Sequence, residues 1–121
     1  MKYLITTIAA VVLMGCDQNL LLHEAAERNN LDLLKQEINA GVNIDAAKGK
    51  NGETALHRAA TRGNLEAAKF LIEKGADPNV RRKKRGYTPL DLANRRGHTK
   101  LADFLRKHRA MTGEELKAEG K

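Results

Sequence analysis

The sequence predicts an all-α solenoid, in which about three helix-turn-helix repeats stack side by side and loops join them. Three observations predict this class: the chain repeats itself at an offset of 34 residues, its apolar residues recur at helical spacing, and its composition is aliphatic. Hydrophobic residues make up 41% of the 121 residues, whereas aromatic residues make up only 3% and Trp is absent. A hydrophobic core with so few aromatic residues is built from Leu, Ile, Val and Ala, which suits stacked helices. The length of the chain allows one domain.

The 34-residue offset falls on the positions that a helical repeat uses for its core and its turns. It relates Leu22, Leu56 and Leu90; Ala25, Ala59 and Ala93; Leu34, Ala68 and Ala102; and Asn29, Gly63 and Gly97. A period of about 20 to 50 residues is typical of stacked repeats, because one repeat cannot bury its apolar face alone.

Residues with special backbone roles mark the ends of the predicted helices. Thr54 and Thr88 are placed to cap the first helix of the second and third repeats. Pro89 suits the first turn because its missing N–H has no partner there. Gly63 is predicted to reverse the chain into a second helix, and Gly75 to end that helix in the left-handed conformation.

Residues 52–79 closely resemble an ankyrin repeat, and residues 86–98 do so as well, through Gly52-Glu53-Thr54-Ala55-Leu56-His57 and Gly86-Tyr87-Thr88-Pro89-Leu90. The resemblance covers residues 20–109, with repeats at about 20–50, 51–84 and 85–109. It implies an ankyrin-repeat solenoid whose repeats are joined by finger loops, and binding of a partner protein by these loops and the adjoining face of each first helix. The first copy lacks the Gly-x-Thr-Pro start, and Asn19 is expected to cap its first helix.

Residues 110–121 are expected to form a C-terminal tail or a short capping helix. Thr112-Gly113-Glu114-Glu115 has the pattern of a capping box. Leu116 is the only large apolar residue of such a helix, so both possibilities stay open.

Residues 1–15 are predicted to be a signal peptide rather than part of the fold. Lys2 precedes an apolar run over residues 4–14, which is shorter than the roughly 20 residues of a membrane-spanning helix. Leu13-Met14-Gly15-Cys16 resembles the lipobox of bacterial lipoproteins, in which the cysteine becomes the lipidated first residue. The alternative is a buried free cysteine in an ordinary N-terminus. The single cysteine excludes an internal disulfide and any multi-cysteine zinc site.

The lipobox resemblance implies an exported protein that is lipid-anchored to a bacterial cell membrane and faces the periplasm or the cell exterior. Asp17 resembles the inner-membrane retention signal of enteric lipoproteins. Residues 16–19 leave only a short lipidated tether, so the domain is expected to lie on the bilayer. A partner at the membrane is then expected, and nucleic acid is not.

The net charge of +7 is concentrated late in the chain. Residues 81–109 hold eleven basic and two acidic side chains, whereas residues 17–80 hold eight and ten. By the register of the repeats, the partner-binding residues are expected to be Arg62, Arg81, Arg82, Lys83, Lys84, Arg85, Tyr87, Arg95 and Arg96. Tyr87 is an exposed-loop aromatic beside arginines, which is typical of an interface hot spot. These cations are expected to attract an acidic protein; anionic lipid headgroups and a merely solvated loop are the alternatives.

The sequence predicts no catalytic residue, cofactor or metal site. His23 and His57 stand at the family's Leu-His position, whose imidazole bonds loop backbone, and no nucleophile with a plausible base or Gly-rich phosphate loop is recognised. The expected function is that of a monomeric, non-enzymatic cell-envelope lipoprotein that mediates protein–protein interaction. The alternatives are an inhibitor or immunity-type protein that occludes a cell-envelope enzyme, and a structural envelope lipoprotein that binds anionic lipid.

Overall fold

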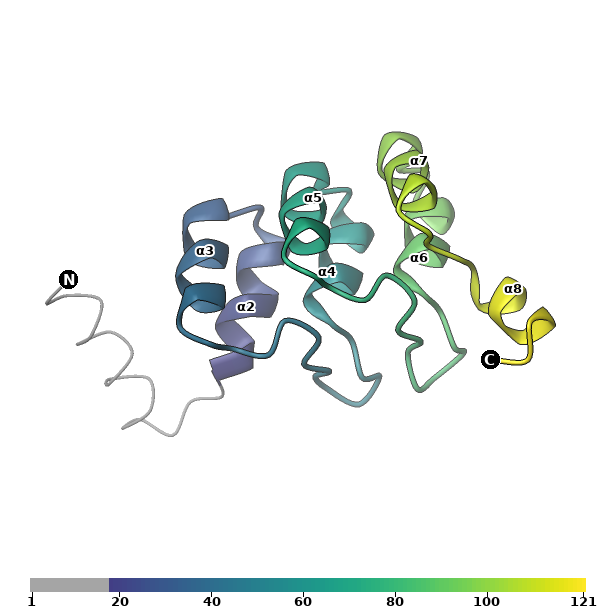
Figure 1. Cartoon of the computed structure of the whole chain (residues 1–121), viewed down its shortest axis with the longest axis horizontal. Helices are drawn as coiled ribbons and strands as arrows, with labels where there is room; N and C mark the ends of the chain where they lie inside the picture. The colour runs from purple at the N-terminus through teal and green to yellow at the C-terminus, as the bar shows by residue number, and fades with distance from the viewer. Residues whose placement is uncertain (1–17) are drawn as a thin grey trace, which may run out of the picture.

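The computed structural model describes residues 18–121, which form three two-helix repeats and one further short helix (Figure 1). The helices are α2 (Gln18–Glu27) and α3 (Leu31–Asn39), α4 (Ala55–Arg62) and α5 (Leu65–Glu73), α6 (Pro89–Arg95) and α7 (Thr99–Lys107), and α8 (Gly113–Ala118). The predicted all-α solenoid is confirmed. The predicted signal peptide (1–15) and Cys16 lie outside the described residues.

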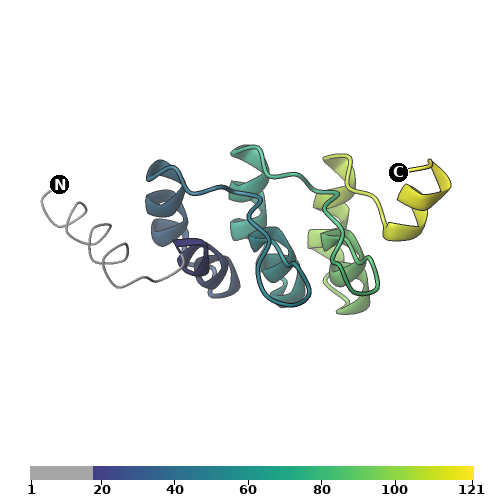
Figure 2. The same ribbon diagram turned by 90° about the horizontal axis from the view of Figure 1, so that it is seen from below.

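The repeats form two helical layers. Helices α2, α4 and α6 pack side by side as an inner layer, and α3, α5 and α7 form an outer layer (Figures 1 and 2). Two long loops lead from an outer helix to the next inner helix. Their tips, residues 48–53 and 82–87, are called the first and the second finger below.

The predicted caps of α4 and α6 are confirmed. The Thr54 hydroxyl oxygen accepts the N–H of His57 at 3.3 Å, and the His57 ring accepts the N–H of Thr54 at 3.1 Å. Thr88 and Asp91 form the same reciprocal pair at the start of α6, and Pro89 is its first residue. These bonds satisfy backbone donors that a helix start leaves without partners.

Leucine and alanine at the repeating positions build the core. The most buried of them on the inner helices, each at most 1% exposed, are Leu22, Leu56, Leu90, Ala25, Ala59 and Ala93. Burial of one leucine side chain contributes about 1.5–3 kcal/mol. The small alanines let neighbouring inner helices approach closely, which explains how the stack forms with so few aromatic residues.

The first repeat differs from the other two at its start and at its turn. Helix α2 begins at Gln18, so Asn19 lies inside the helix instead of capping it. Asn29 takes the left-handed conformation (φ 56°) that Gly63 takes in the second repeat (φ 71°), and Asn adopts this conformation more readily than most residues. Asn30 then caps α3 through its side chain. A pair of asparagines therefore replaces the Gly turn.

One side chain of each inner helix ties its repeat to the next element along the stack. His23 and His57 donate from Nε2 to the carbonyl oxygens of the residues before Thr54 and Thr88, at 2.7 and 3.0 Å. Asp91 replaces the histidine in the third repeat and reverses the direction, because its carboxylate accepts the first N–H of α8 at 2.9 Å. These three side chains therefore connect the inner layer from α2 to α8.

Helix α8 packs beyond α6 at the C-terminal end of the stack (Figure 1). Its capping box is formed, with Thr112 and Glu115 each accepting the other's N–H at 3.1 Å. The hydrogen bonds from Thr112 lower the pKa of Glu115 below 4.5. Leu116 is buried. One apolar side chain and one capping box thus hold a short helix in residues 110–121.

Candidate partner-binding groove

The two fingers are hairpin-like and lie against each other. In the first finger, Lys48 and Glu53 exchange two backbone hydrogen bonds of 2.8 and 2.9 Å. In the second finger, the N–H of Arg82 donates to the carbonyl of Tyr87 at 2.9 Å. The N–H of Lys83 donates to the carbonyl of Asn51 at 2.8 Å, which joins the second finger to the first.

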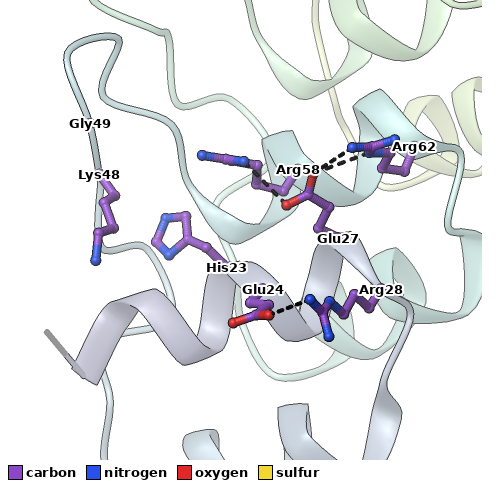
Figure 3. A pocket seen from close by; sticks show the side chains of 8 residues that line it. All are labelled: His23, Glu24, Glu27, Arg28, Lys48, Gly49, Arg58 and Arg62. Carbon is purple, nitrogen blue, oxygen red and sulfur yellow. Dashed lines mark hydrogen bonds and ion pairs between the residues drawn. The ribbon is translucent and has the colours of Figure 1, made fainter. Parts of the chain in front are cut away.

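A groove runs between the fingers and the inner helices. A first-finger cavity of about 610 Å³ is lined by His23, Glu24, Glu27, Arg28, Lys48, Gly49, Arg58 and Arg62 (Figure 3). A second-finger cavity of about 550 Å³ is lined by Asn51, Arg82, Lys84, Arg85, Tyr87, Leu92, Arg95 and Arg96. A smaller cavity shares Glu27, Arg58 and Arg62 with the first and Arg96 with the second, so it lies between them.

Both signs of charge line the first-finger cavity, with four cations and two carboxylates. Glu27 points between two arginines of α4 (Figure 3), with Arg62 Nη2 at 2.7 Å and Arg58 Nη1 at 3.3 Å from its carboxylate. Glu24 pairs with Arg28 at 2.8 Å. The hydrogen bond from Arg62, followed by the charge of Arg58, lowers the pKa of Glu27 below 4.5. Glu27 therefore carries its charge at neutral pH and partly neutralises both α4 arginines.

The ion pairs continue across the middle of the groove as a chain, Glu27–Arg58–Glu53–Arg82. The Glu53 carboxylate lies 3.1 Å from Arg58 Nε and 3.5 Å from Arg82 Nε. Both Nε atoms are buried without a well-aligned hydrogen bond, so their contact with Glu53 is mainly one of charge. These ion pairs link the first repeat to α4 and to both fingers.

The second-finger cavity has a strongly positive lining. Five cations line it, namely Arg82, Lys84, Arg85, Arg95 and Arg96, and its lining contains no carboxylate. Arg82 is paired with Glu53, whereas the other four side chains are exposed. Arginine presents a planar fork of donors that matches a carboxylate. This half of the groove is therefore suited to an anionic group.

Tyr87 forms a wall of this cavity rather than a free aromatic on a loop. Its ring is half-buried and packs against the core, and the Arg95 guanidinium lies 4.8 Å from the ring centre. Cation–π contact at this distance holds Arg95 against the ring. The wall therefore presents an aromatic face and a fixed cation together.

The residues predicted to bind a partner fall into three groups in the structure. Arg82, Lys84, Arg85, Tyr87, Arg95 and Arg96 converge on the second-finger cavity. Arg62 lies in the first-finger cavity, where Glu27 already occupies its guanidinium. Arg81 and Lys83 are exposed and line neither cavity. The role of these residues in partner binding stays a prediction.

Two members of the ion-pair chain, Glu27 and Arg58, were not anticipated from the sequence, whereas the register of the repeats places Glu53 on this face. Arg58 precedes Arg62 by four residues on α4, so helical spacing alone could have placed the two on one face. No comparable signal pairs Glu27 with Arg62, because these residues are 35 positions apart. Lys50, exposed on the first finger, adds to the positive surface beyond the predicted cations of residues 81–85.

Both nitrogens of the His57 ring have structural partners, in the backbone of Thr54 and of Tyr87. His57 is buried, and its burial lowers its pKa below 6.5 although its bond to the Tyr87 carbonyl acts in the opposite direction. Within residues 18–121, no group of three or more His, Cys, Asp or Glu side chains is placed to hold a metal ion.

A comparison with protein families supports the same view of the fold. The family model described as ankyrin repeats (3 copies) matches residues 22–115. No curated protein matches the chain. Ankyrin repeats are protein–protein interaction modules and typically non-catalytic scaffolds. With most of its length matched, this chain belongs to the ankyrin-repeat family.

Proposed function

We propose that the chain binds an acidic segment of another protein in the second-finger cavity. The observation that carries this proposal is the lining of that cavity, which has five cations and no carboxylate. Such a surface steers an acidic partner toward the groove and accelerates its association more than it raises the final affinity. Acidic here describes the partner's contact segment, not its whole surface.

The distribution of charge along the groove favours the second-finger cavity over the first-finger cavity as the site for an acidic segment. Glu27 and Glu53 pair with Arg58, Arg62 and Arg82, which reduces the positive potential of the first half. A carboxylate that approaches the groove is therefore attracted most strongly to Arg85, Arg95 and Arg96. The Tyr87 ring beside Arg95 offers apolar contact next to the charge.

The test uses three chains that differ in where positive charge is removed. A groove variant carries Arg85→Gln, Arg95→Gln and Arg96→Gln. An outer-layer variant carries Lys35→Gln, Lys69→Gln and Lys100→Gln, which removes the same charge from α3, α5 and α7. Crosslinking and pull-down from membranes should recover one acidic protein with the wild type and the outer-layer variant, and at least about tenfold less with the groove variant. Equal recovery by all three chains contradicts the proposal.

We also propose that Cys16 carries a lipid that anchors this module to a membrane of the cell envelope. The support is the Leu13-Met14-Gly15-Cys16 sequence together with the start of α2 at Gln18, two residues after the cysteine. In residues 18–121 no helix is long and apolar enough to cross a membrane. Cys16→Ser should leave the protein unprocessed or move it to the soluble fraction. Unchanged processing and membrane fractionation of that variant contradict the anchor.

A further inference from the structure

The fingers and the start of α2 lie at the same edge of the stack. The first finger leads directly into Thr54 and α4, and the second finger leads into Thr88 and α6. Because α2 packs side by side with α4, it also begins at the finger edge, as both views show (Figures 1 and 2). A chain that enters α2 at Gln18 therefore enters beside the fingers.

The finger edge carries exposed lysines that the groove does not explain. Lys50 is at the tip of the first finger, and Lys83 and Lys84 are at the tip of the second; all three are exposed. Lys50 and Lys83 line neither of the two finger cavities. The one carboxylate within the two fingers, Glu53, faces Arg58 and Arg82 instead. Lys50 and Lys83 thus lie outside the groove, and Lys84 lies where this positive fingertip surface meets the second-finger cavity.

The two fingers hold these lysines on one platform. The N–H of Lys83 donates to the Asn51 carbonyl at 2.8 Å. The side chain of Lys83 also crosses Gly52, where an added Cβ would lie 3.3 Å from its Cγ. The platform has charge but no apolar centre of the kind that dominates protein interfaces. It fits an anionic surface better than a shaped protein site.

We propose that the fingertip lysines rest on the anionic headgroups of the membrane to which the chain is anchored, while the groove is left for the partner protein. This inference depends on the membrane anchor proposed above. Gln18 is two positions after Cys16, with Asp17 between them, which gives an extended reach of about 7 Å. That reach is shorter than the Debye length of about 8–10 Å at moderate ionic strength. Gln18 therefore lies within the field of an anionic leaflet, and the fingers are at the same edge of the stack (Figures 1 and 2).

The test measures hydrogen–deuterium exchange of the full chain reconstituted into vesicles, with no partner protein present. One set of vesicles contains phosphatidylcholine alone, and the other contains phosphatidylglycerol as well. Amides of residues 48–53 and 82–87 should exchange at least about tenfold more slowly in the anionic vesicles, and added salt should remove the difference. A fingertip variant with Lys50→Gln, Lys83→Gln and Lys84→Gln should weaken the contact by about two orders of magnitude, since each cation contributes about fivefold.

The outer-layer variant is the matched control, because it also loses three lysines but keeps the fingertips. It should behave as the wild type in both vesicles. Equal finger exchange in the two vesicles, or equal effects of the two variants, overturns the inference. Failure of the chain to attach to either vesicle overturns it together with the anchor. Protection that arises only after an acidic protein is added assigns the fingertips to a protein and also overturns it. None of these outcomes changes the groove variant's result, so the two proposals fail separately.

Discussion

Gly63 is the position where one added methyl group has the most clearly defined cost. The residue ends α4 in the left-handed conformation (φ 71°) and lies beneath the ring of His98. A Cβ at Gly63 would be 2.5 Å from His98 Nδ1. That ring also donates from Nε2 to the carbonyl of Thr61 at 3.1 Å, which ties the third repeat to the turn of the second. Gly63→Ala therefore strains the backbone and displaces a contact between repeats.

The expected loss is about 2–3 kcal/mol in the free energy of unfolding. A left-handed alanine costs about 1–2 kcal/mol relative to glycine, and loss of the hydrogen bond to Thr61 costs about 1 kcal/mol. Gly97→Ala is the matched control, because Gly97 has nearly the same φ (74°) and nothing within 4 Å of the added Cβ. Gly97→Ala should cost only about 1–2 kcal/mol, which is the cost of the left-handed backbone conformation without the clash.

Urea unfolding of the full chain, followed by circular dichroism, measures both values. The reasoning also predicts coupling: in a His98→Ala background, Gly63→Ala should cost about as much as Gly97→Ala does in the wild type. Equal losses for Gly63→Ala and Gly97→Ala, or no coupling to His98, would refute the steric explanation.

Three further predictions concern ionisable groups. Because the folded pKa of His57 lies below its ordinary value of 6.5, the unfolded chain binds more protons and stability should fall as pH drops below about 6.5; His57→Gln should remove this part of the slope in urea midpoints measured across pH. Glu37 is buried at the position that Leu71 and Leu105 occupy in the other repeats, and burial raises its pKa above 4.5. Its contribution to stability is therefore present below pH 4.5 and is lost as pH rises through the folded pKa, so Glu37→Gln should raise the urea midpoint at pH 7 and leave it nearly unchanged at acidic pH. Glu53→Gln removes the carboxylate shared by Arg58 and Arg82, which leaves Glu27 as the partner of Arg58. The substitution should cost about 1–2 kcal/mol at low salt and less at high salt, as salt-dependent unfolding would show.

The backbone plan of this chain could be predicted because it depends on local chemistry. Thr54 and Thr88 cap helices wherever a helix starts beside them, and Gly63 and Gly75 permit positive φ regardless of their neighbours. Arg109 also takes positive φ (68°) at the position of Gly75 in the third repeat. Arginine carries no signal for that conformation, so this turn could not be recognised from its residue type.

The groove was less predictable because its ion pairs depend on how repeats pack. Register placed Arg95 and Arg96 beside the second finger, as the structure shows. It did not indicate that Arg62 and Arg82 would be paired with Glu27 and Glu53, which come from other parts of the sequence. Ion pairs between long side chains of different repeats form only when neighbouring helices have packed, so no local sequence pattern predicts them.

The rate at which the captured acidic partner associates with the chain, measured as a function of salt, tests the role of the groove most directly. The wild type and the outer-layer variant should associate quickly at low salt and lose rate steeply as salt is added. The groove variant, lacking the cations of Arg85, Arg95 and Arg96, should associate at least about tenfold more slowly at low salt and depend only weakly on salt. Identical rates and salt slopes for the wild type and the groove variant would contradict capture of an acidic segment by the second-finger cavity.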